Sequence, residues 1–122
     1  MQVTVTTNWL EKNLKDVIIL DASWYLPSDN RNTFIEYRSK HIPNAQFFDI
    51  DEISDKESQL PHMLPKPSLF DEQVERLGIS NDQKVIVYDT EGLFSAARAW
   101  WMFKVMGHNE VFVLDGGLPK WI

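Results

Sequence analysis

The chain has 122 residues, of which 43% are hydrophobic and 25% are charged, a balance that predicts one globular domain spanning residues 1–122. A formal net charge of -6, from 18 acidic and 12 basic residues with the basic ones scattered singly, argues against nucleic acid as a partner. The chain contains no cysteine, which excludes disulfides, cysteine-ligated metal and a thiolate nucleophile.

Membrane, export and metal signals are not found in the sequence. No apolar run approaches the roughly 20 residues that cross a bilayer, and the first residues lack the apolar core of a signal peptide. We therefore expect a cytoplasmic protein with no membrane partner. The three histidines, His41, His62 and His108, are too far apart to form a recognisable ligand motif, so we expect no metal and no other cofactor.

The first half of the chain alternates helical and strand patterns. A Thr/Asn cap opens a predicted helix at residues 7–14. The apolar run at 16–22, bounded by polar residues, is typical of a strand buried on both faces of a parallel sheet. A second helix is predicted at 33–39. The segment 49–67 holds several charges and prolines with little periodicity, which predicts a long surface loop.

The alternation continues in the second half. A helix is predicted at 68–77, ending at Gly78, and apolar runs at 84–89 and 110–115 repeat the pattern of a buried strand. Strands that alternate with helices predict an α/β fold with a parallel sheet. Each apolar run carries an aspartate at or near its end, so we expect a ligand site at the edge where the carboxyl ends of the strands meet.

The longest predicted helix runs over 95–106, with Ser95 as its cap. Four of its residues are expected to supply much of the core: Trp100, Trp101, Phe103 and Val105. The last residues, 116–122, predict a turn that leads into a helix which stops within its second turn. This pattern predicts a domain truncated at its carboxyl end.

The stretch 88–98, Tyr-Asp-Thr-Glu-Gly-Leu-Phe-Ser-Ala-Ala-Arg, joins the end of a buried strand to the start of a long helix. Backbone N–H groups of such a loop can form a cradle for an anion together with the helix N-terminus. The first residue of this cradle is Asp89, which we expect to hold the turn by accepting backbone hydrogen bonds rather than to act in catalysis. Arg98 is expected to fix the loop by pairing with an acid, the candidates being Asp21, Asp89 and Glu91.

Several segments follow one another in an order that resembles a known family. They are Asp-Ala-Ser-Trp-Tyr-Leu-Pro at 21–27, His-Ile-Pro-Asn-Ala at 41–45, Phe-Phe-Asp-Ile-Asp at 47–51, His-Met-Leu-Pro at 62–65, Arg-Ala-Trp-Trp-Met-Phe at 98–103, and Leu-Asp-Gly-Gly at 114–117. Together they resemble the rhodanese family, and more closely the amino-terminal half of two-domain thiosulfate and 3-mercaptopyruvate sulfurtransferases. The resemblance implies a three-layer fold with a central, mostly parallel five-stranded sheet flanked by helices.

The loop after the second apolar run departs from the family pattern. In active rhodanese domains this loop has the form Cys-x-x-Gly-x-Arg-Ser, and its cysteine takes up a sulfane sulfur. This chain has Asp89 at the cysteine position, and its loop equivalent consists of Thr90, Glu91, Gly92, Leu93, Phe94 and Ser95, with Phe94 where the arginine would stand. A carboxylate cannot accept a sulfane sulfur, so the chain alone is expected to be inactive and no catalytic residue is assigned.

By the same resemblance, the chain is the non-catalytic half that packs against a carboxyl-terminal rhodanese domain bearing the nucleophile. The complete enzyme would move sulfur from thiosulfate or 3-mercaptopyruvate to cyanide, another thiol or thioredoxin. The pocket between the halves would be lined by Trp24, His41, Leu93 and Phe94. From the residues alone, Trp24 can equally be core, and His41 can simply cap the preceding helix.

A second hypothesis is a free-standing, inactive rhodanese-like module that binds a protein or senses an anion. It predicts a polar surface where the first hypothesis predicts exposed apolar side chains around Trp24, Leu93 and Phe94. A phosphatase of the related Cdc25 type is excluded, because it needs a cysteine nucleophile and a loop one residue longer.

Overall fold

A computed structural model describes residues 3–23, 32–48, 67–79, 83–90, 94–108 and 110–121, with the backbone alone described at Thr33, 67–69 and Phe94. The predicted surface loop falls almost entirely outside these ranges. Its last residue, Pro67, begins a helix.

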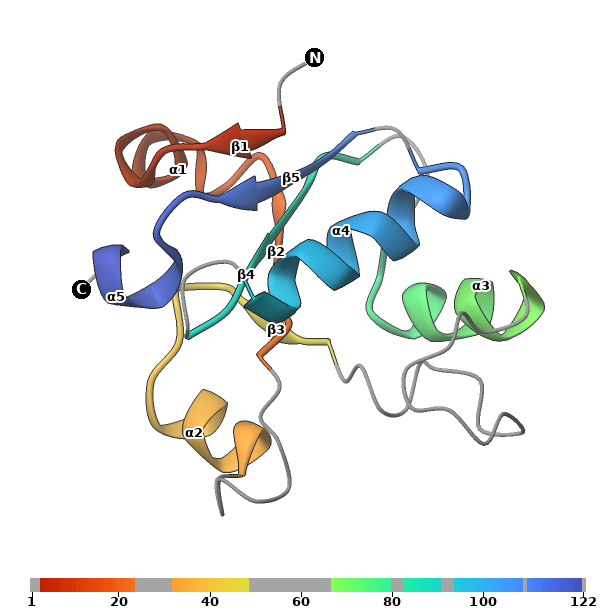
Figure 1. Cartoon of the computed structure of the whole chain (residues 1–122), viewed down its shortest axis with the longest axis horizontal. Coiled ribbons are helices and arrows are strands. Elements are labelled where there is room, and N and C mark those ends of the chain that lie inside the picture. Colours follow the sequence, from red (N-terminus) through yellow and green to blue (C-terminus); the bar gives the residue numbers. More distant parts are fainter. Residues whose placement is uncertain are drawn as a thin grey trace.

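The centre of the molecule is a five-stranded sheet in the order β1-β5-β4-β2-β3, and all of its strands are parallel (Figure 1). The strands are β1 (Thr4–Val5), β2 (Ile18–Asp21), β3 (Gln46–Phe47), β4 (Val85–Tyr88) and β5 (Val111–Leu114). The three strands predicted from apolar runs are β2, β4 and β5, which occupy the middle of the sheet. The edge strands β1 and β3 have two residues each, too few to produce a periodic pattern.

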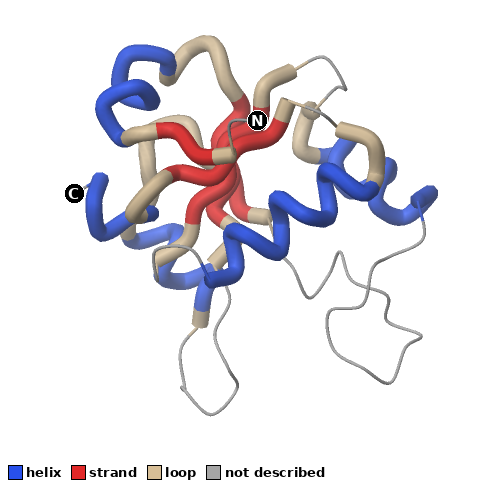
Figure 2. Tube along the Cα trace, turned by 45° about the horizontal axis from the view of Figure 1, so that its top comes forward, coloured by secondary structure: helices blue, strands red, loops and turns tan. Residues whose placement is uncertain are grey.

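Helices cover both faces of the sheet, which gives the three layers that the family resemblance implied (Figure 2). The helices are α1 (Thr7–Asn13), α2 (Thr33–Ser39), α3 (Pro67–Arg76), α4 (Phe94–Val105) and α5 (Gly117–Trp121). Side chains of α3 and α4 pack in one core cluster, and side chains of α1, α2 and α5 pack in the other.

The two clusters meet the sheet through alternating residues of the same strands. In β2, Leu20 belongs to the cluster under α3 and α4, whereas Ile19 belongs to the opposite one. In β4, Val87 and Ile86 divide in the same way. Because successive side chains of a strand point to opposite faces, a sheet covered on both sides needs apolar residues at every position. This explains the continuous apolar runs of the sequence.

Local signals set the ends of the first and third helices. The Thr6 side chain accepts a hydrogen bond from the Trp9 backbone N–H, at 3.1 Å, and so caps α1. Gly78 follows α3 with a φ of 78°, and the Ile79 N–H donates to the Val74 carbonyl at 3.1 Å. A residue with a positive φ directly after a helix, together with a hydrogen bond back to the last turn, forms a Schellman motif, in which glycine is favoured. The prediction that α3 ends at Gly78 is therefore confirmed.

Helix α4 supplies the centre of one core cluster. Ala99, Met102 and Phe103 have no exposed surface, and the Phe103 ring lies 5.5 Å from Phe48 and 5.1 Å from Phe70, measured between ring centroids. The half-buried Trp100 packs on the same cluster and donates its indole N–H to the Val111 carbonyl at 3.1 Å.

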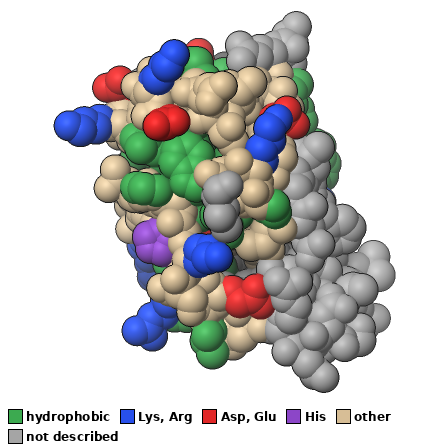
Figure 3. Space-filling view, turned by 90° about the vertical axis from the view of Figure 1, so that its left-hand side faces the viewer, with side chains coloured by type: hydrophobic (Ala, Val, Ile, Leu, Met, Phe, Trp, Pro, Cys, Tyr) green, Lys and Arg blue, Asp and Glu red, His purple; other side chains and the backbone are tan. Residues whose placement is uncertain are grey.

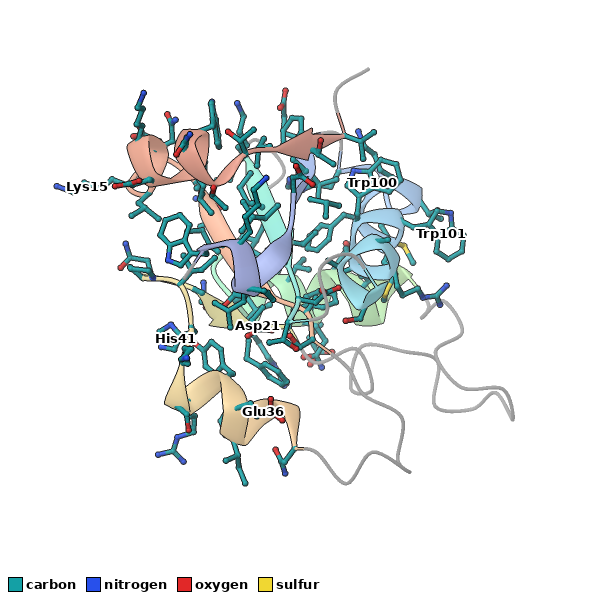
Figure 4. All side chains as sticks on the ribbon, turned by 60° about the vertical axis from the view of Figure 1, so that its left-hand side comes forward. Lys15, Asp21, Glu36, His41, Trp100 and Trp101 are labelled. Carbon is teal, nitrogen blue, oxygen red and sulfur yellow. The ribbon has the colours of Figure 1, made fainter. Side chains whose placement is uncertain are left out.

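The prediction that Trp101 and Val105 belong to the core is wrong. Trp101 is 41% exposed and Val105 is 49% exposed. The two residues are one helical turn apart, on a side of α4 that does not face the sheet, and Figure 4 shows Trp101 pointing outward.

None of the helices within the described ranges is long and apolar enough to span a bilayer.

Truncating Met102 should test the assignment of the core face of α4. Met102→Ala removes a fully buried side chain and is expected to lower the free energy of unfolding by about 2–5 kcal/mol. Val105→Ala, on the exposed side of the same helix, should change it by no more than about 0.5 kcal/mol. Urea unfolding followed by circular dichroism measures both, and equal losses would contradict the assignment.

Candidate functional site

The candidate site lies where β2 and β4 end side by side. Asp21 is in register with Tyr88, and the Ala22 N–H donates to the Tyr88 carbonyl at 2.8 Å. The segments that follow the two strands therefore begin next to each other at the carboxyl edge of the sheet. This is the edge at which the aspartates at the ends of the apolar runs predicted a site.

Asp89 joins the end of β4 to the start of α4. Its side chain is buried, with 1% of the residue exposed, and one carboxylate oxygen accepts a hydrogen bond of 2.7 Å from the Ala96 N–H in the first turn of the helix. Its backbone carbonyl accepts a second bond, at 3.0 Å, from Leu118 of α5. The first-turn N–H groups of a helix lack partners within the helix, and the helix dipole favours a negative charge there. The prediction that Asp89 holds this turn is confirmed.

Ser95 does not cap α4, contrary to the prediction. It lies inside the first turn of the helix, where its buried hydroxyl has no hydrogen-bond partner among the residues that the structure describes. The backbone donor in this turn is instead bound by the carboxylate of Asp89. The Asp89 side chain, at the end of β4, therefore accepts the hydrogen bond that was expected to go to Ser95.

A second carboxylate, Asp21, lies at the end of β2 and is 1% exposed. It accepts a hydrogen bond of 3.0 Å from the Ser23 N–H, and the Ser23 hydroxyl accepts one of 3.1 Å from the Thr90 N–H. Burial raises the pKa of Asp21, and the nearby charge of Asp89 adds to the rise. Asp21 and Ser23 thus fix the first residue of the loop that follows Asp89.

Tyr88 completes this network, although no pattern in the sequence predicts a role for it at the site. Its hydroxyl forms a hydrogen bond with the Asp21 carboxyl and accepts another, of 3.3 Å, from the Ile42 N–H. Tyr88 has no exposed surface, and burial raises the pKa of its hydroxyl, so that it remains protonated at neutral pH. One feature of the sequence could have indicated this role: Tyr88 is the last residue of an otherwise aliphatic strand and is followed directly by Asp89.

His41 lies on the segment between α2 and β3 (Figure 4). Its Nδ1 is 2.9 Å from the Ile42 carbonyl, and because a carbonyl only accepts, we assign the proton to Nδ1. The ring stacks on Tyr37 at 4.6 Å between centroids and is exposed to solvent. The His41 ring therefore forms its hydrogen bond with the backbone of the next residue, Ile42, rather than with a carbonyl of α2. Within the described residues, His41 is linked to Asp21 indirectly, because the Ile42 N–H is hydrogen-bonded to the Tyr88 hydroxyl, which is in turn hydrogen-bonded to Asp21.

Arg98 lies one turn into α4, and its guanidinium carbon is 4.7 Å from the centroid of the Trp101 ring. Its Nε is buried without an acceptor among the described residues, and burial lowers the pKa of the guanidinium. Among the described residues Arg98 makes no ion pair, so the pairing with Asp21 or Asp89 is not observed. Glu91, the third candidate, lies outside the described residues.

Several predicted site residues lie outside the described ranges: Trp24, Glu91, Gly92 and Leu93. Phe94 is described by its backbone alone, as the first residue of α4. Within the part of the chain that the structure describes, no group of three or more histidines and acids is placed to hold a metal ion.

The geometry sets a clear limit on chemistry at this edge. The described site residues offer carboxylates, hydroxyls and amides, and the chain contains no thiol. One helix-terminal N–H that could stabilise an external anion is already bound to the internal anion Asp89. A negatively charged ligand entering there would also be repelled by that carboxylate.

Residues 6–122 match the rhodanese-like domain family, and the chain belongs to this family. It is 56% identical over 119 residues to thiosulfate/3-mercaptopyruvate sulfurtransferase 1, mitochondrial, of Arabidopsis thaliana, covering 96% of this chain and 31% of that protein. It is 44% identical over 126 residues to human 3-mercaptopyruvate sulfurtransferase, covering 97% of this chain and 42% of that protein. The chain thus spans less than half of the length of these relatives, as predicted for a domain of a longer sulfurtransferase.

Solved structures agree with this assignment. SseA of Escherichia coli, described as a 3-mercaptopyruvate sulfotransferase, has a TM-score of 0.92 and 44% identity, covering 99% of this chain and 47% of that chain. The human single-domain sulfurtransferase TSTD1 has a TM-score of 0.67 at 14% identity, which shows a common fold alone. The rhodanese-like fold predicted from the sequence is therefore confirmed.

Removing the Asp89 carboxylate should weaken the start of α4. Asp89→Ala is expected to lower the free energy of unfolding by about 0.5–2 kcal/mol, the usual effect of losing a helix cap, with a smaller loss in Asp89→Asn, which keeps an acceptor oxygen. Asp115→Ala is a matched control, because Asp115 directly follows β5 and forms an exposed ion pair with Lys120 at 3.6 Å. Equal effects of Asp89→Ala and Asp115→Ala in urea unfolding would contradict the capping role.

The pKa of Asp21 should respond to its burial and to the neighbouring Asp89 side chain. Because the folded-state pKa of Asp21 is raised above its unfolded value of about 3.9, the folded state holds this proton to higher pH. The free energy of unfolding of the wild type relative to Asp21→Asn should therefore fall as pH rises from about 3.9 through the raised pKa. Carbon-detected NMR of the Asp21 carboxyl should show a lower pKa in Asp89→Asn, and an unchanged pKa would show that the two charges do not interact.

Proposed function

We propose that this chain is the catalytically silent, amino-terminal rhodanese domain of a thiosulfate or 3-mercaptopyruvate sulfurtransferase. Its role is structural and pocket-forming, and the nucleophilic cysteine belongs to a carboxyl-terminal rhodanese domain. The complete enzyme moves a sulfane sulfur from the donor to a thiophilic acceptor. The names and lengths of the relatives support this proposal.

The single observation that carries the proposal is the hydrogen bond of 2.7 Å between the Ala96 N–H and the Asp89 carboxylate. Asp89 stands at the position of the family's cysteine, where an active domain stabilises an anionic persulfide with backbone amides. In this chain the Asp89 side chain accepts such a bond. The fold of the loop therefore does not depend on a reactive anion, and no group at this position can take up sulfur.

The pocket residues remain part of the proposal. Trp24, His41, Leu93 and Phe94 would line the space shared with the carboxyl-terminal domain. For His41, support comes from its fixed ring, since stacking on Tyr37 and the bond to Ile42 leave Nε2 free to accept a proton or a hydrogen bond.

The location of the protein is a separate matter from its activity. The sequence predicts a cytoplasmic protein. The Arabidopsis thaliana relative is named as mitochondrial.

The decisive measurement is sulfurtransferase activity with thiosulfate and cyanide, and with 3-mercaptopyruvate. It is made on this chain alone and again after the chain is mixed with the carboxyl-terminal part of a relative. The purified chain alone should show no turnover above buffer, because it has no thiol. Adding the carboxyl-terminal remainder of the Arabidopsis thaliana relative, produced separately and checked for folding by circular dichroism, should give more activity than the remainder alone.

Two outcomes would contradict the proposal. Turnover by the chain alone would overturn its catalytic silence. A remainder that is equally active with and without the chain would remove the pocket-forming role and favour a free-standing rhodanese-like module.

A further inference from the structure

The segment that carries His41 leads directly into a tight turn. The Ala45 N–H donates to the Ile42 carbonyl at 2.9 Å, and Asn44 has a φ of 68°. A proline at the second position of a turn and a positive φ at the third are features of a type II β-turn, which has a well-defined geometry. We call residues 42–45 the His41 turn.

Two tyrosine hydroxyls hold the His41 turn, one at each end. The Tyr88 hydroxyl, from the end of β4, accepts a hydrogen bond of 3.3 Å from the Ile42 N–H. The Tyr37 hydroxyl, from α2, donates one of 2.6 Å to the Ala45 carbonyl. Because Ile42 and Ala45 are both buried, water cannot easily replace these hydroxyls, and the position of the turn depends on them.

The Tyr88 hydroxyl has both of its hydrogen-bonding roles filled. The Ile42 N–H can only donate, so the proton of the hydroxyl is directed to the Asp21 carboxyl. Burial raises the pKa of the Tyr37 hydroxyl, and the nearby charge of Asp21 adds to the rise. Both hydroxyls therefore stay protonated at neutral pH, close to the same carboxyl.

The His41 turn in its place sets the state of the His41 ring. The Ile42 carbonyl that closes the turn also accepts a hydrogen bond of 2.9 Å from His41 Nδ1, and a carbonyl oxygen has lone pairs for both bonds. With the proton on Nδ1, the exposed ring presents Nε2 as an acceptor. Figure 3 shows the face formed by α1, α5 and α2, where a histidine side chain lies at the surface.

We infer that Tyr37 and Tyr88 are positioning residues for His41, whose Nε2 accepts a hydrogen bond from a ligand group that carries a proton. The role toward a ligand rests on the proposed function, whereas the positioning of the ring does not. Of the two donors in the proposed reaction, 3-mercaptopyruvate carries a thiol proton and thiosulfate carries none at neutral pH. His41 and the two tyrosines therefore act on the binding of 3-mercaptopyruvate and not on that of thiosulfate.

NMR of the ring nitrogens of His41 tests the positioning on this chain alone. Long-range proton–nitrogen correlation, at a pH at which the ring is neutral, should show mainly the Nδ1–H tautomer in the wild type. Tyr37→Phe and Tyr88→Phe each keep the ring and lose the hydroxyl. Each should lower the ratio of Nδ1–H to Nε2–H by about twofold or more, as expected when one hydrogen bond is weakened.

Trp100→Phe is the matched control for these variants. It removes the bond from the Trp100 indole to the Val111 carbonyl, in the core cluster on the opposite face of the sheet, and should leave the tautomer ratio of His41 unchanged. All three variants must first show wild-type circular dichroism. A wild-type ring that is mainly Nε2–H would overturn the positioning without any variant, and so would folded tyrosine variants with an unchanged ratio.

Kinetics of the chain mixed with the carboxyl-terminal remainder of the Arabidopsis thaliana relative test the role toward a ligand. The KM for 3-mercaptopyruvate should rise by about threefold or more in Tyr37→Phe, Tyr88→Phe and His41→Ala, the usual effect of losing one hydrogen bond. The kcat and the KM for thiosulfate should change by less than about twofold. Because Tyr88 acts through His41, adding Tyr88→Phe to His41→Ala should not raise the KM further.

The outcomes separate this inference from the proposed function. An unchanged KM for 3-mercaptopyruvate, an equal rise for thiosulfate, or a further rise in the double variant would overturn the role assigned to these residues and leave the proposed function standing. If mixing with the wild-type chain gives no gain in activity, the proposed function fails and the ligand role fails with it. The tautomer ratio then still decides whether the two tyrosines position His41.

Discussion

The turn from β4 into α4 depends on one hydrogen bond, from the Ala96 N–H to the buried carboxylate of Asp89. A strand that ends under a helix N-terminus leaves unpaired backbone donors in a space that excludes water, and some acceptor must bind them. In this chain the acceptor is the side chain of Asp89. The same bond that stabilises the turn also occupies a backbone N–H of the first turn of α4, which is therefore not available to another anion.

Burying Asp89 requires the neighbouring segments to accommodate its charge. Asp21 lies on the adjacent strand, and its raised pKa records both burial and repulsion between the two acids. Ser23 and Tyr88 offset this cost by hydrogen bonding to Asp21, and the Tyr88 hydroxyl also binds the Ile42 backbone. A network of this kind is strongly stabilising only when all of its members are satisfied. It therefore ties the ends of two strands to the turn that carries His41.

The sequence predicted the parts of this structure that follow from local pattern or from chemistry. β2, β4 and β5 are buried on both faces, so their apolar runs stand out, whereas β1 and β3 contain two residues each and have no pattern to detect. Aromatic content suggested that Trp101 was core, but composition does not tell which side of a helix meets the sheet. Ser95 was expected as the cap because capping rules consider only adjacent residues, and the true acceptor, Asp89, lies several residues earlier at the end of a strand. The network through Tyr88 joins residues far apart in sequence, which no local rule can find.

Helix α4 connects the candidate site to the outside of the molecule. Its first turn is anchored at the carboxyl edge of the sheet, its inner side fills the core with Met102 and Phe103, and its outer side presents Trp101. A rigid helix held at one end and along one side can transmit the position of anything bound to its exposed side. The exposed side of α4 is therefore held in a fixed orientation relative to the edge where Asp89 and Asp21 lie.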